Sequence, residues 1–318
     1  MCRRRVEAAL HTGVFVAMAR HDGPSSPASY TSGMTVVLPS RNVQGVSVPS
    51  FFYGTAWKEE RTRTLTALAL EAGFRAIDTA NQRRHYFEAA VGDAVKSLLG
   101  SGTIARSGLF LQSKFTFAAG QDHRLPYDRQ ASIDKQVLQS LQSSLDHFGT
   151  AYLDSVLLHG PSTRHGLNDE DWEAWRAMEA LKLDGKARLI GVSNMSAEQL
   201  ELLFARAKVK PAFVQNRCYA RTGWDREVRA LAKAHDIVYQ GFSLLTANAR
   251  EVQGSTIKGI AARHGRTEAQ VVFRFALEVG MIPLTGTTDR RHMQEDLGAF
   301  EFALDPEEVA AIETGLAP

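Results

Sequence analysis

Three ionisable side chains of different types each stand at the end of a short apolar stretch of the sequence. Asp78 ends the stretch FRAID, Lys114 follows LFLQS and His159 follows DSVLL. Tyr86 lies in the segment that begins after Asp78. If these stretches are neighbouring parallel strands, their carboxyl ends meet at one edge. We therefore expect the four side chains to form a proton-donating centre.

The chemistry expected of this centre is the polarisation and protonation of a carbonyl group. A tyrosine phenol has a pKa near ~10, and a neighbouring ammonium such as that of Lys114 stabilises its phenolate. Asp78 would keep that lysine charged, while His159 would hydrogen-bond the carbonyl and favour a developing alkoxide. The nucleophile elbow, HExxH and P-loop motifs are missing from the sequence, which argues against acyl transfer, zinc hydrolysis and phosphoryl transfer. We expect no metal.

Each of these residues also has an ordinary structural interpretation. An aspartate after a strand commonly caps a turn, a lysine is usually solvated, and a buried histidine is more often a structural hydrogen bonder. Three ionisable types at the ends of three successive strands favour a functional site. Two alternatives stay open. One is a catalytically weak cofactor-binding or regulatory subunit, and the other is a barrel isomerase or lyase that forms a Schiff base on Lys114.

The pattern around these residues predicts alternating strands and helices. The expected strands are 50–54, 74–78, 109–113, 154–158, 188–192, 212–216, 237–242 and 281–284. The expected helices are 59–72, 86–99, 128–148, 169–184, 196–207, 225–235 and 256–279, the last with a break at 264–265. Eight such repeats predict an α/β fold, a (β/α)8 TIM barrel.

Two further elements are expected at the ends of the barrel. Segments 35–38 and 45–48 flank residues 39–43, which predicts an N-terminal β-hairpin that plugs the barrel. A C-terminal extra helix is expected to begin at Asp305-Pro306. Ser196 and Gln199 have the spacing of a helix capping box.

The composition is that of an ordinary globular protein. The 318 residues are 44% hydrophobic and 23% charged, and 37 Lys and Arg against 35 Asp and Glu give a net charge of +2. This balance argues against nucleic acid or a membrane as a partner, so we expect a small-molecule carbonyl substrate and a monomer or weak dimer. Two cysteines, Cys2 and Cys218, make no disulfide framework. That fits a cytoplasmic protein.

Residues 1–33 are rich in arginine and serine and are expected to lie outside the barrel. We interpret them as a flexible leader, an extension upstream of Met34, or an organelle-targeting segment. The domain expected to carry the activity is 34–318.

From about residue 34 to the C-terminus the sequence resembles the aldo-keto reductases. The resemblance rests on Gly73–Ala80 (GFRAIDTA), Leu157–His159 (LLH), Gly185–Asn194 (GKARLIGVSN) and Ala269–Arg274 (AQVVFR). It implies a catalytic tetrad of Asp78, Tyr86, Lys114 and His159, with Tyr86 as general acid and base. It also implies hydride transfer between NADPH, less often NADH, and an aldehyde or ketone without any metal.

The resemblance further implies which residues bind the cofactor and the substrate. Ser193, Asn194 and Gln215 would hold the nicotinamide carboxamide, Phe242 would stack on its ring, and Ser243 and Leu244 would lead toward the pyrophosphate. The other expected cofactor contacts are Gly54, Thr55, Asp78, Thr285, Gly286, Thr287, His292, Glu295 and Asp296. The expected substrate contacts are Trp57, Tyr86 and His159.

The sequence departs from the family pattern in two places. Eight positions instead of five separate Asp78 from Tyr86, with Arg83 at the usual spacing, and residues 115–130 form an insertion expected over the mouth. At the adenosine end His292 stands where the family has an arginine, and no lysine is present. Because Arg290 and Arg291 lie beside it, we expect NADP as cofactor, with NAD as the alternative.

Overall fold

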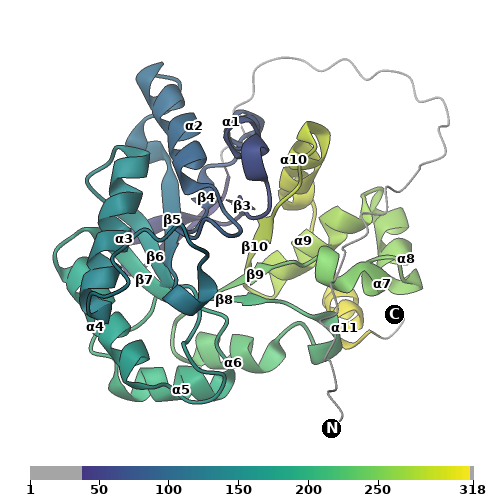
Figure 1. Cartoon of the computed structure of the whole chain (residues 1–318). Coiled ribbons are helices and arrows are strands. Elements are labelled where there is room, and N and C mark those ends of the chain that lie inside the picture. Colours follow the sequence, from purple (N-terminus) through teal and green to yellow (C-terminus); the bar gives the residue numbers. More distant parts are fainter. Residues whose placement is uncertain (1–37, 316–318) are drawn as a thin grey trace, which may run out of the picture. The chain divides into compact units, whose positions relative to one another are not determined.

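Eight parallel strands close into a barrel in this computed structural model, which describes residues 38–315. Around the barrel the strands follow in the order β10, β3, β4, β5, β6, β7, β8, β9, with helices outside them (Figure 1). The (β/α)8 prediction is confirmed, and each expected strand overlaps one observed. The strands are β3 (Phe52–Gly54), β4 (Ala76–Asp78), β5 (Phe110–Phe115), β6 (Leu153–Leu158), β7 (Ala187–Ser193), β8 (Phe213–Arg217), β9 (Val238–Phe242) and β10 (Ile282–Thr285).

Each expected helix overlaps an observed one. The observed helices are α1 (Thr62–Ala72), α2 (Glu88–Gly100), α3 (Ile133–Phe148), α4 (Asp169–Leu183), α5 (Ala197–Arg206), α6 (Arg226–Ala234), α7 (Ala249–Val252), α8 (Ser255–His264), α9 (Glu268–Glu278), α10 (Arg290–Leu297) and α11 (Pro306–Thr314). Of these, α7 and α10 were not expected. Helix α3 begins five residues later than expected, because the carboxylate of Asp128 accepts from the amide of Gln130 and holds a turn there. The capping box of Ser196 and Gln199 is present.

An N-terminal hairpin of β1 (Ser40–Val43) and β2 (Val46–Pro49) closes one end of the barrel. The expected pairing was wrong in detail, because residues 40–43, taken as the loop, form the first strand and Gln44-Gly45 makes a tight turn. The expected strand 35–38 lies almost wholly outside the described residues, as does the leader 1–33. Val43 and Val46 pack in one apolar cluster with inward side chains of the barrel strands. The hairpin is therefore the plug that was predicted.

Side chains inside the barrel form an apolar layer above the hairpin. Alternate residues of a strand point to opposite faces, so every second residue points inward. The apolar layer consists of Phe52, Ala76, Phe110, Leu157, Leu189, Phe213, Ile282 and Leu284. Gly191 lies beside it on β7, where a Cβ would come within 2.7 Å of the backbone oxygen of Phe213. The next inward residues toward the strand ends are polar and belong to the site described below.

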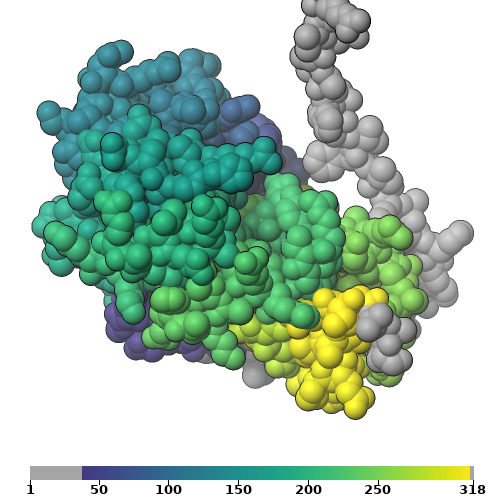
Figure 2. Space-filling view, turned by 90° about the horizontal axis from the view of Figure 1, so that it is seen from below, coloured from purple at the N-terminus to yellow at the C-terminus, as the bar shows by residue number. Residues whose placement is uncertain are grey.

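The C-terminal helix α11 packs beside the loop that follows β8. The indole nitrogen of Trp224 donates to the backbone oxygen of Ile312 at 2.9 Å, and Arg263 of α8 pairs with Glu308 at 2.9 Å. Figure 2 shows α11 in yellow against the green segments before it. The extra C-terminal helix is thus confirmed. Within residues 38–315 no helix is long and apolar enough to cross a membrane.

Candidate active site

Asp78 and Lys114 form a buried ion pair where β4 and β5 end. The lysine Nζ lies 2.7 Å from each carboxylate oxygen of Asp78 and 2.8 Å from the backbone oxygen of Thr79. These three contacts use all three ammonium protons. Burial lowers the pKa of Lys114, while the Asp78 carboxylate opposes that shift. The pair is therefore fixed in place, with no ammonium proton left over.

Three glutamines lie beside Asp78 and connect opposite sides of the barrel. Gln112 of β5 and Gln215 of β8 each donate to Asp78 Oδ1, at 2.8 and 2.9 Å. Both also donate to the side-chain oxygen of Gln240 on β9, at 2.8 and 2.9 Å. All four side chains are buried. Buried polar groups of this kind hold one geometry when every donor is satisfied, so the layer fixes Asp78 rigidly.

Tyr86 is brought beside this ion pair by the loop after β4. Its ring lies 5.7 Å from the ring of His159, and Lys114 Nζ lies 5.3 Å from the centre of the Tyr86 ring. Within residues 38–315 its hydroxyl makes no hydrogen bond. Burial raises the pKa of Tyr86, the Asp78 carboxylate raises it further and Arg217 lowers it. The expectation that the lysine would bring this pKa down is wrong for the structure as it stands, because burial and Asp78 prevail.

Two other side chains of the loop after β4, those of Arg83 and His85, contact residues other than Lys114 and His159. The guanidinium of Arg83 lies 3.8 Å from the ring centre of Phe87 and forms an ion pair with Glu60 at 3.5 Å. The ring of His85 stacks at 4.1 Å on Trp57, whose side chain is 67% exposed at the rim. Among Arg83, His85 and Tyr86, it is Tyr86 that lies against Lys114 and His159.

His159 is held from two sides after β6. Its Nδ1 lies 2.6 Å from the hydroxyl oxygen of Thr116, and its backbone oxygen accepts from the side chain of Asn194 at 2.7 Å. Burial lowers the pKa of His159 well below its ordinary value, and the charge of Lys114 lowers it further. The imidazole is therefore neutral near pH 7 and acts as a hydrogen-bonding group rather than a cation.

The inserted segment 115–130 is hydrogen-bonded to the Tyr86 loop and, through the hydroxyl of Thr116, to His159. Tyr127 donates to the backbone oxygen of Thr116 at 2.7 Å, and Gln121 donates to that of Asn81 at 2.9 Å. Gln82 donates to the backbone oxygen of Gly120 at 2.6 Å. The insertion and the longer Asp78-to-Tyr86 interval are thus parts of one structural change, since each loop supplies hydrogen bonds to the other.

The expected carboxamide-binding residues lie together at the ends of β7 and β8. Ser193 donates to the backbone oxygen of Gln215 at 2.7 Å, and Asn194 donates to the hydroxyl of Ser193 at 3.1 Å. Both amide protons of Gln215 are used by Asp78 and Gln240. Its side-chain oxygen makes no hydrogen bond in the part of the chain that the structure describes, so it can accept one from a ligand.

The next expected cofactor contacts come from the ends of β9 and β3. Phe242 continues the inward row of β9, Ser243 follows it with a φ of 58°, and the side chain of Leu244 is buried in the outer core. Leu244 therefore offers its backbone alone. Gly54 ends β3, and the Thr55 hydroxyl donates to the backbone oxygen of Asp78 at 3.0 Å.

At the β10 end, two of the expected cofactor residues bond to each other. The hydroxyl of Thr285 donates to the carboxylate of Asp296 at 2.7 Å, and both side chains are buried. Burial raises the pKa of Asp296 to about 7. Thr287 follows, and its backbone oxygen accepts from Tyr53 at 3.0 Å. The side chains of Thr285 and Asp296 are thus bonded to each other and are not both free for a ligand.

Cationic groups gather on the first turn of α10. His292 is half-buried there. Arg290 pairs with Glu71 at 3.2 Å, and Arg291 pairs with Glu295 at 3.4 Å. Exposed pairs of this kind contribute at most about 1 kcal/mol, so a phosphate can displace the carboxylates.

Several residues of the site were missed in the sequence. Lys58, a buried lysine after β3, donates to the backbone oxygen of Gly286 at 2.6 Å, and burial, aided by Arg61, lowers its pKa to about 8. Thr116, Gln112 and Gln240 were missed as well. The glutamines had a readable signal, because both occupy inward positions in apolar strands, where an uncharged polar residue needs a partner.

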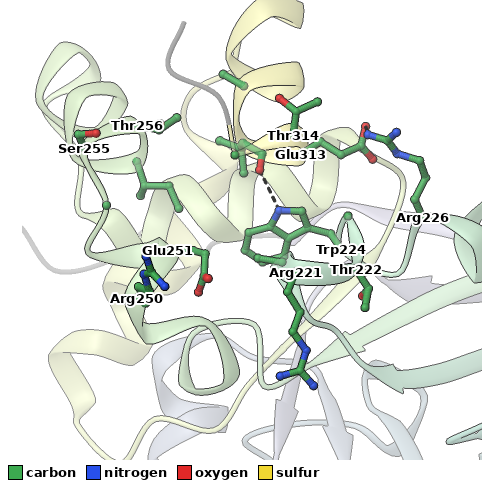
Figure 3. Close-up of a pocket in the computed structure, with 17 residues that line it drawn as sticks. Arg221, Thr222, Trp224, Arg226, Arg250, Glu251, Ser255, Thr256, Glu313 and Thr314 are labelled. Carbon is green, nitrogen blue, oxygen red and sulfur yellow. Dashed lines mark hydrogen bonds and ion pairs between the residues drawn. The ribbon is translucent and has the colours of Figure 1, made fainter.

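A separate cavity of about 800 Å³ lies between the loop after β8, α7, the start of α8 and the end of α11 (Figure 3). Arg221, Arg226 and Arg250 are among its lining residues, and Arg226 pairs with Glu313 at 3.1 Å. None of the expected site residues lines it. The residues that could do chemistry are at the barrel mouth instead.

Comparison with known proteins gives the same family as the resemblance in the sequence. The model of the aldo/keto reductase family matches residues 51–316. The chain belongs to this family. An aldo-keto reductase of Mycobacterium avium is 34% identical over 255 residues, which is 80% of this chain and 81% of that protein. As a member of the family, the chain is an oxidoreductase acting on carbonyl or alcohol groups.

Solved aldo-keto reductases share the barrel. The structure from Brucella melitensis is 29% identical with a TM-score of 0.73, and the match covers 87% of this chain and 99% of that one. A Bombyx mori aldo-keto reductase solved in complex with NADP has a TM-score of 0.74 at 24% identity, over 87% of this chain and 92% of that one. At that identity the second likeness shows the fold alone.

Proposed function

We propose that this aldo-keto reductase reduces an aldehyde or ketone to an alcohol with NADPH, and that Tyr86 is the proton donor. The observation that carries the proposal is the meeting of Tyr86, His159 and the Asp78–Lys114 pair at one end of the barrel. The family match and the burial of Asp78 and Lys114 at the strand ends support it.

The residues at the mouth fit a nicotinamide cofactor. The free side-chain oxygen of Gln215 suits a carboxamide N–H, with Asn194 and Ser193 beside it, and Phe242 lies one inward layer above Gln215. Lys58, next to Gly286, and the cations of α10 supply positive charge for phosphates. When bound, the cofactor supplies or accepts a hydride.

We expect protein fluorescence quenching to give a lower Kd for NADPH than for NADH. Replacing both Arg290 and Arg291 with alanine is expected to raise the Kd for NADPH by about tenfold or more and to leave that for NADH unchanged. Equal affinities for the two cofactors would favour NAD use.

The protein's own groups then act on the carbonyl oxygen. His159, neutral at working pH, donates a hydrogen bond to that oxygen and orients it. Negative charge that developed on this oxygen during reduction would be neutralised by the Tyr86 hydroxyl, which would give its proton to it. The charges of Lys114 and Arg217 stabilise the resulting phenolate. The proton is then restored from water, and the product is the alcohol.

The raised pKa of Tyr86 is consistent with a donor rather than a nucleophile. A phenol that stays protonated at neutral pH is in the form that reduction needs, and an alkoxide is more basic than a phenolate, so the transfer is downhill. Lys114 is unsuited to forming a Schiff base in this structure, because Asp78 and Thr79 hold all its protons. This observation disfavours the isomerase or lyase alternative.

The test is NADPH oxidation by 4-nitrobenzaldehyde, followed by absorbance. Tyr86→Phe is expected to lower kcat by about 10²-fold to 10⁴-fold, with the Kd for NADPH unchanged. Tyr152→Phe is the matched control, since Tyr152 precedes β6 at the opposite end of the barrel. Wild-type activity in Tyr86→Phe contradicts the proposal. Tight NADPH binding without turnover of any carbonyl by the wild type supports the regulatory-subunit alternative.

A further inference from the structure

Arg217 is the last residue of β8, and its side chain belongs to the inward row of that strand. Phe213 packs in the inner apolar layer and Gln215 bonds to Asp78, while Asn216 points outward to Asp225. The alternation of the strand therefore directs Arg217 into the mouth, one layer above Gln215. On the neighbouring strand it pairs in register with Phe242, and its guanidinium lies 5.7 Å from that ring centre.

The guanidinium of Arg217 is exposed and has no ion pair or hydrogen bond among residues 38–315. Two other arginines at the rim are neutralised, since Arg83 pairs with Glu60 and Arg124 with Asp122. The charge of Arg217 also reaches the reacting end of the site, where it lowers the pKa of Tyr86 against the effects of burial and Asp78. An unpaired cation thus lies near enough to the candidate proton donor for its charge to act on it.

An unpaired guanidinium in a concave mouth attracts anions, and its planar fork matches a carboxylate. Two ligands could bring a negative charge to it: the phosphates of the cofactor and the substrate. Lys58, which donates to the backbone oxygen of Gly286, places a positive charge between β3 and β10, on the side of the cofactor's expected phosphates. Arg217 lies on β8, next to the ring expected to face the nicotinamide. This position favours the substrate.

We propose that Arg217 binds a carboxylate on the substrate, so that this reductase prefers carbonyl compounds that carry a carboxylate. The inference rests on the proposed function, because it names the substrate class of the same site. The anion would be held while the carbonyl of the same molecule reaches Tyr86 and His159. Binding energy at Arg217 would then position the reacting carbon.

The kinetic test compares 4-formylbenzoate with 4-formylbenzamide, which have the same shape and differ in charge. Wild-type kcat/KM is expected to favour the carboxylate by about tenfold to 100-fold, as for a hydrogen-bonded ion pair. Arg217→Gln is expected to bring the ratio to about one by raising KM for the carboxylate, and Arg217→Lys to restore part of it. Arg221→Gln, which removes an equal charge beside the cavity of Figure 3, is expected to leave the ratio unchanged.

Binding measurements separate this inference from the proposed function. Benzoate and benzamide are titrated into wild type and Arg217→Gln in the presence of NADP+, with tryptophan fluorescence as the readout. Saturable benzoate binding that is lost in Arg217→Gln supports the carboxylate site even if no aldehyde is reduced. A wild-type substrate ratio near one overturns the proposal. A weaker Kd for NADPH with an equal fall for both aldehydes also overturns it, because it assigns Arg217 to a cofactor phosphate.

Discussion

The hydroxyl oxygen of Thr116 lies 2.6 Å from Nδ1 of His159. Thr116 is buried, and this is the one hydrogen bond of its hydroxyl within residues 38–315. If Nδ1 carried the proton, the hydroxyl hydrogen would have no acceptor, at a cost of about 1 to 3 kcal/mol. The hydroxyl therefore donates to Nδ1, and the imidazole proton resides on Nε2. This is the tautomer that can donate to a carbonyl oxygen.

Replacing Thr116 with valine is expected to lower kcat/KM for an aldehyde by about tenfold, because His159 loses the bond that selects its tautomer. Thr116→Ser keeps the hydroxyl and is expected to stay close to wild type. The ¹⁵N shifts of His159 provide the readout that a mere packing defect would not move. A protonated Nε2 in wild type and a mixture in Thr116→Val are expected. Unchanged shifts in Thr116→Val contradict this role.

The affinity for NADPH is expected to fall as pH rises through about 8. Lys58 is charged below this pKa and neutral above it, so attraction to the cofactor's phosphates is present at pH 7 and is lost above pH 8. The Kd should rise by up to about tenfold per pH unit beyond that point. Lys58→Met is expected to bind weakly at pH 7 and to lack the step. Lys96→Met, at an exposed lysine, should keep it, and a step that survives in Lys58→Met argues against this assignment.

Gly92 is expected to tolerate no side chain, because α2 and the end of α3 approach each other there. A Cβ at Gly92 would lie 2.0 Å from the backbone oxygen of His147, which only a backbone shift relieves. Gly92→Ala should lower the free energy of unfolding by about 1 to 3 kcal/mol or more. The control is Gly100→Ala in the same helix, where nothing lies within 4 Å. That variant should be neutral or slightly stabilised in urea unfolding, and equal midpoints for the two variants would refute the steric explanation.

Asp296→Asn is expected to stabilise the protein at pH 8 more than at pH 5. In the folded chain the pKa of Asp296 is about 7 rather than 3.8, so the native state holds the proton longer than the unfolded state. Stability therefore falls as pH rises from about 4 to 7, by at most about 4 kcal/mol, and stays lower above that range. Because asparagine does not ionise, the Asp296→Asn variant is expected to keep its stability over this pH range. Thermal unfolding across the pH range is the measurement, and parallel curves for the two proteins would show that Asp296 ionises normally.

The barrel could be predicted from the sequence because each apolar strand and each capped helix is recognisable from its own local pattern of residues. The sequence was insufficient for the first hairpin strand, since Ser40–Val43 contains one buried residue and shows no alternation to read. Asp78, Lys114 and His159 could be placed from the strand ends alone. The positions of Tyr86 and Thr116 depend on two loops that bond to each other, and a contact between residues 38 or 40 positions apart leaves no periodic signal.

The hydrogen bonds within the layer of Gln112, Gln215 and Gln240 run in a fixed donor-to-acceptor direction, and Asp78 determines that direction. A glutamine amide can be turned end for end at little cost, so three of them alone could be satisfied in more than one orientation. The carboxylate only accepts, which obliges Gln112 and Gln215 to present nitrogen to it and Gln240 to present oxygen to both. The same constraint leaves the side-chain oxygen of Gln215 without a hydrogen bond within residues 38–315. The negative charge of Asp78 thereby determines which end of the Gln215 amide is free, so, if Gln215 binds the cofactor as proposed, Asp78→Asn is expected to alter cofactor recognition as well as the charge beside Lys114.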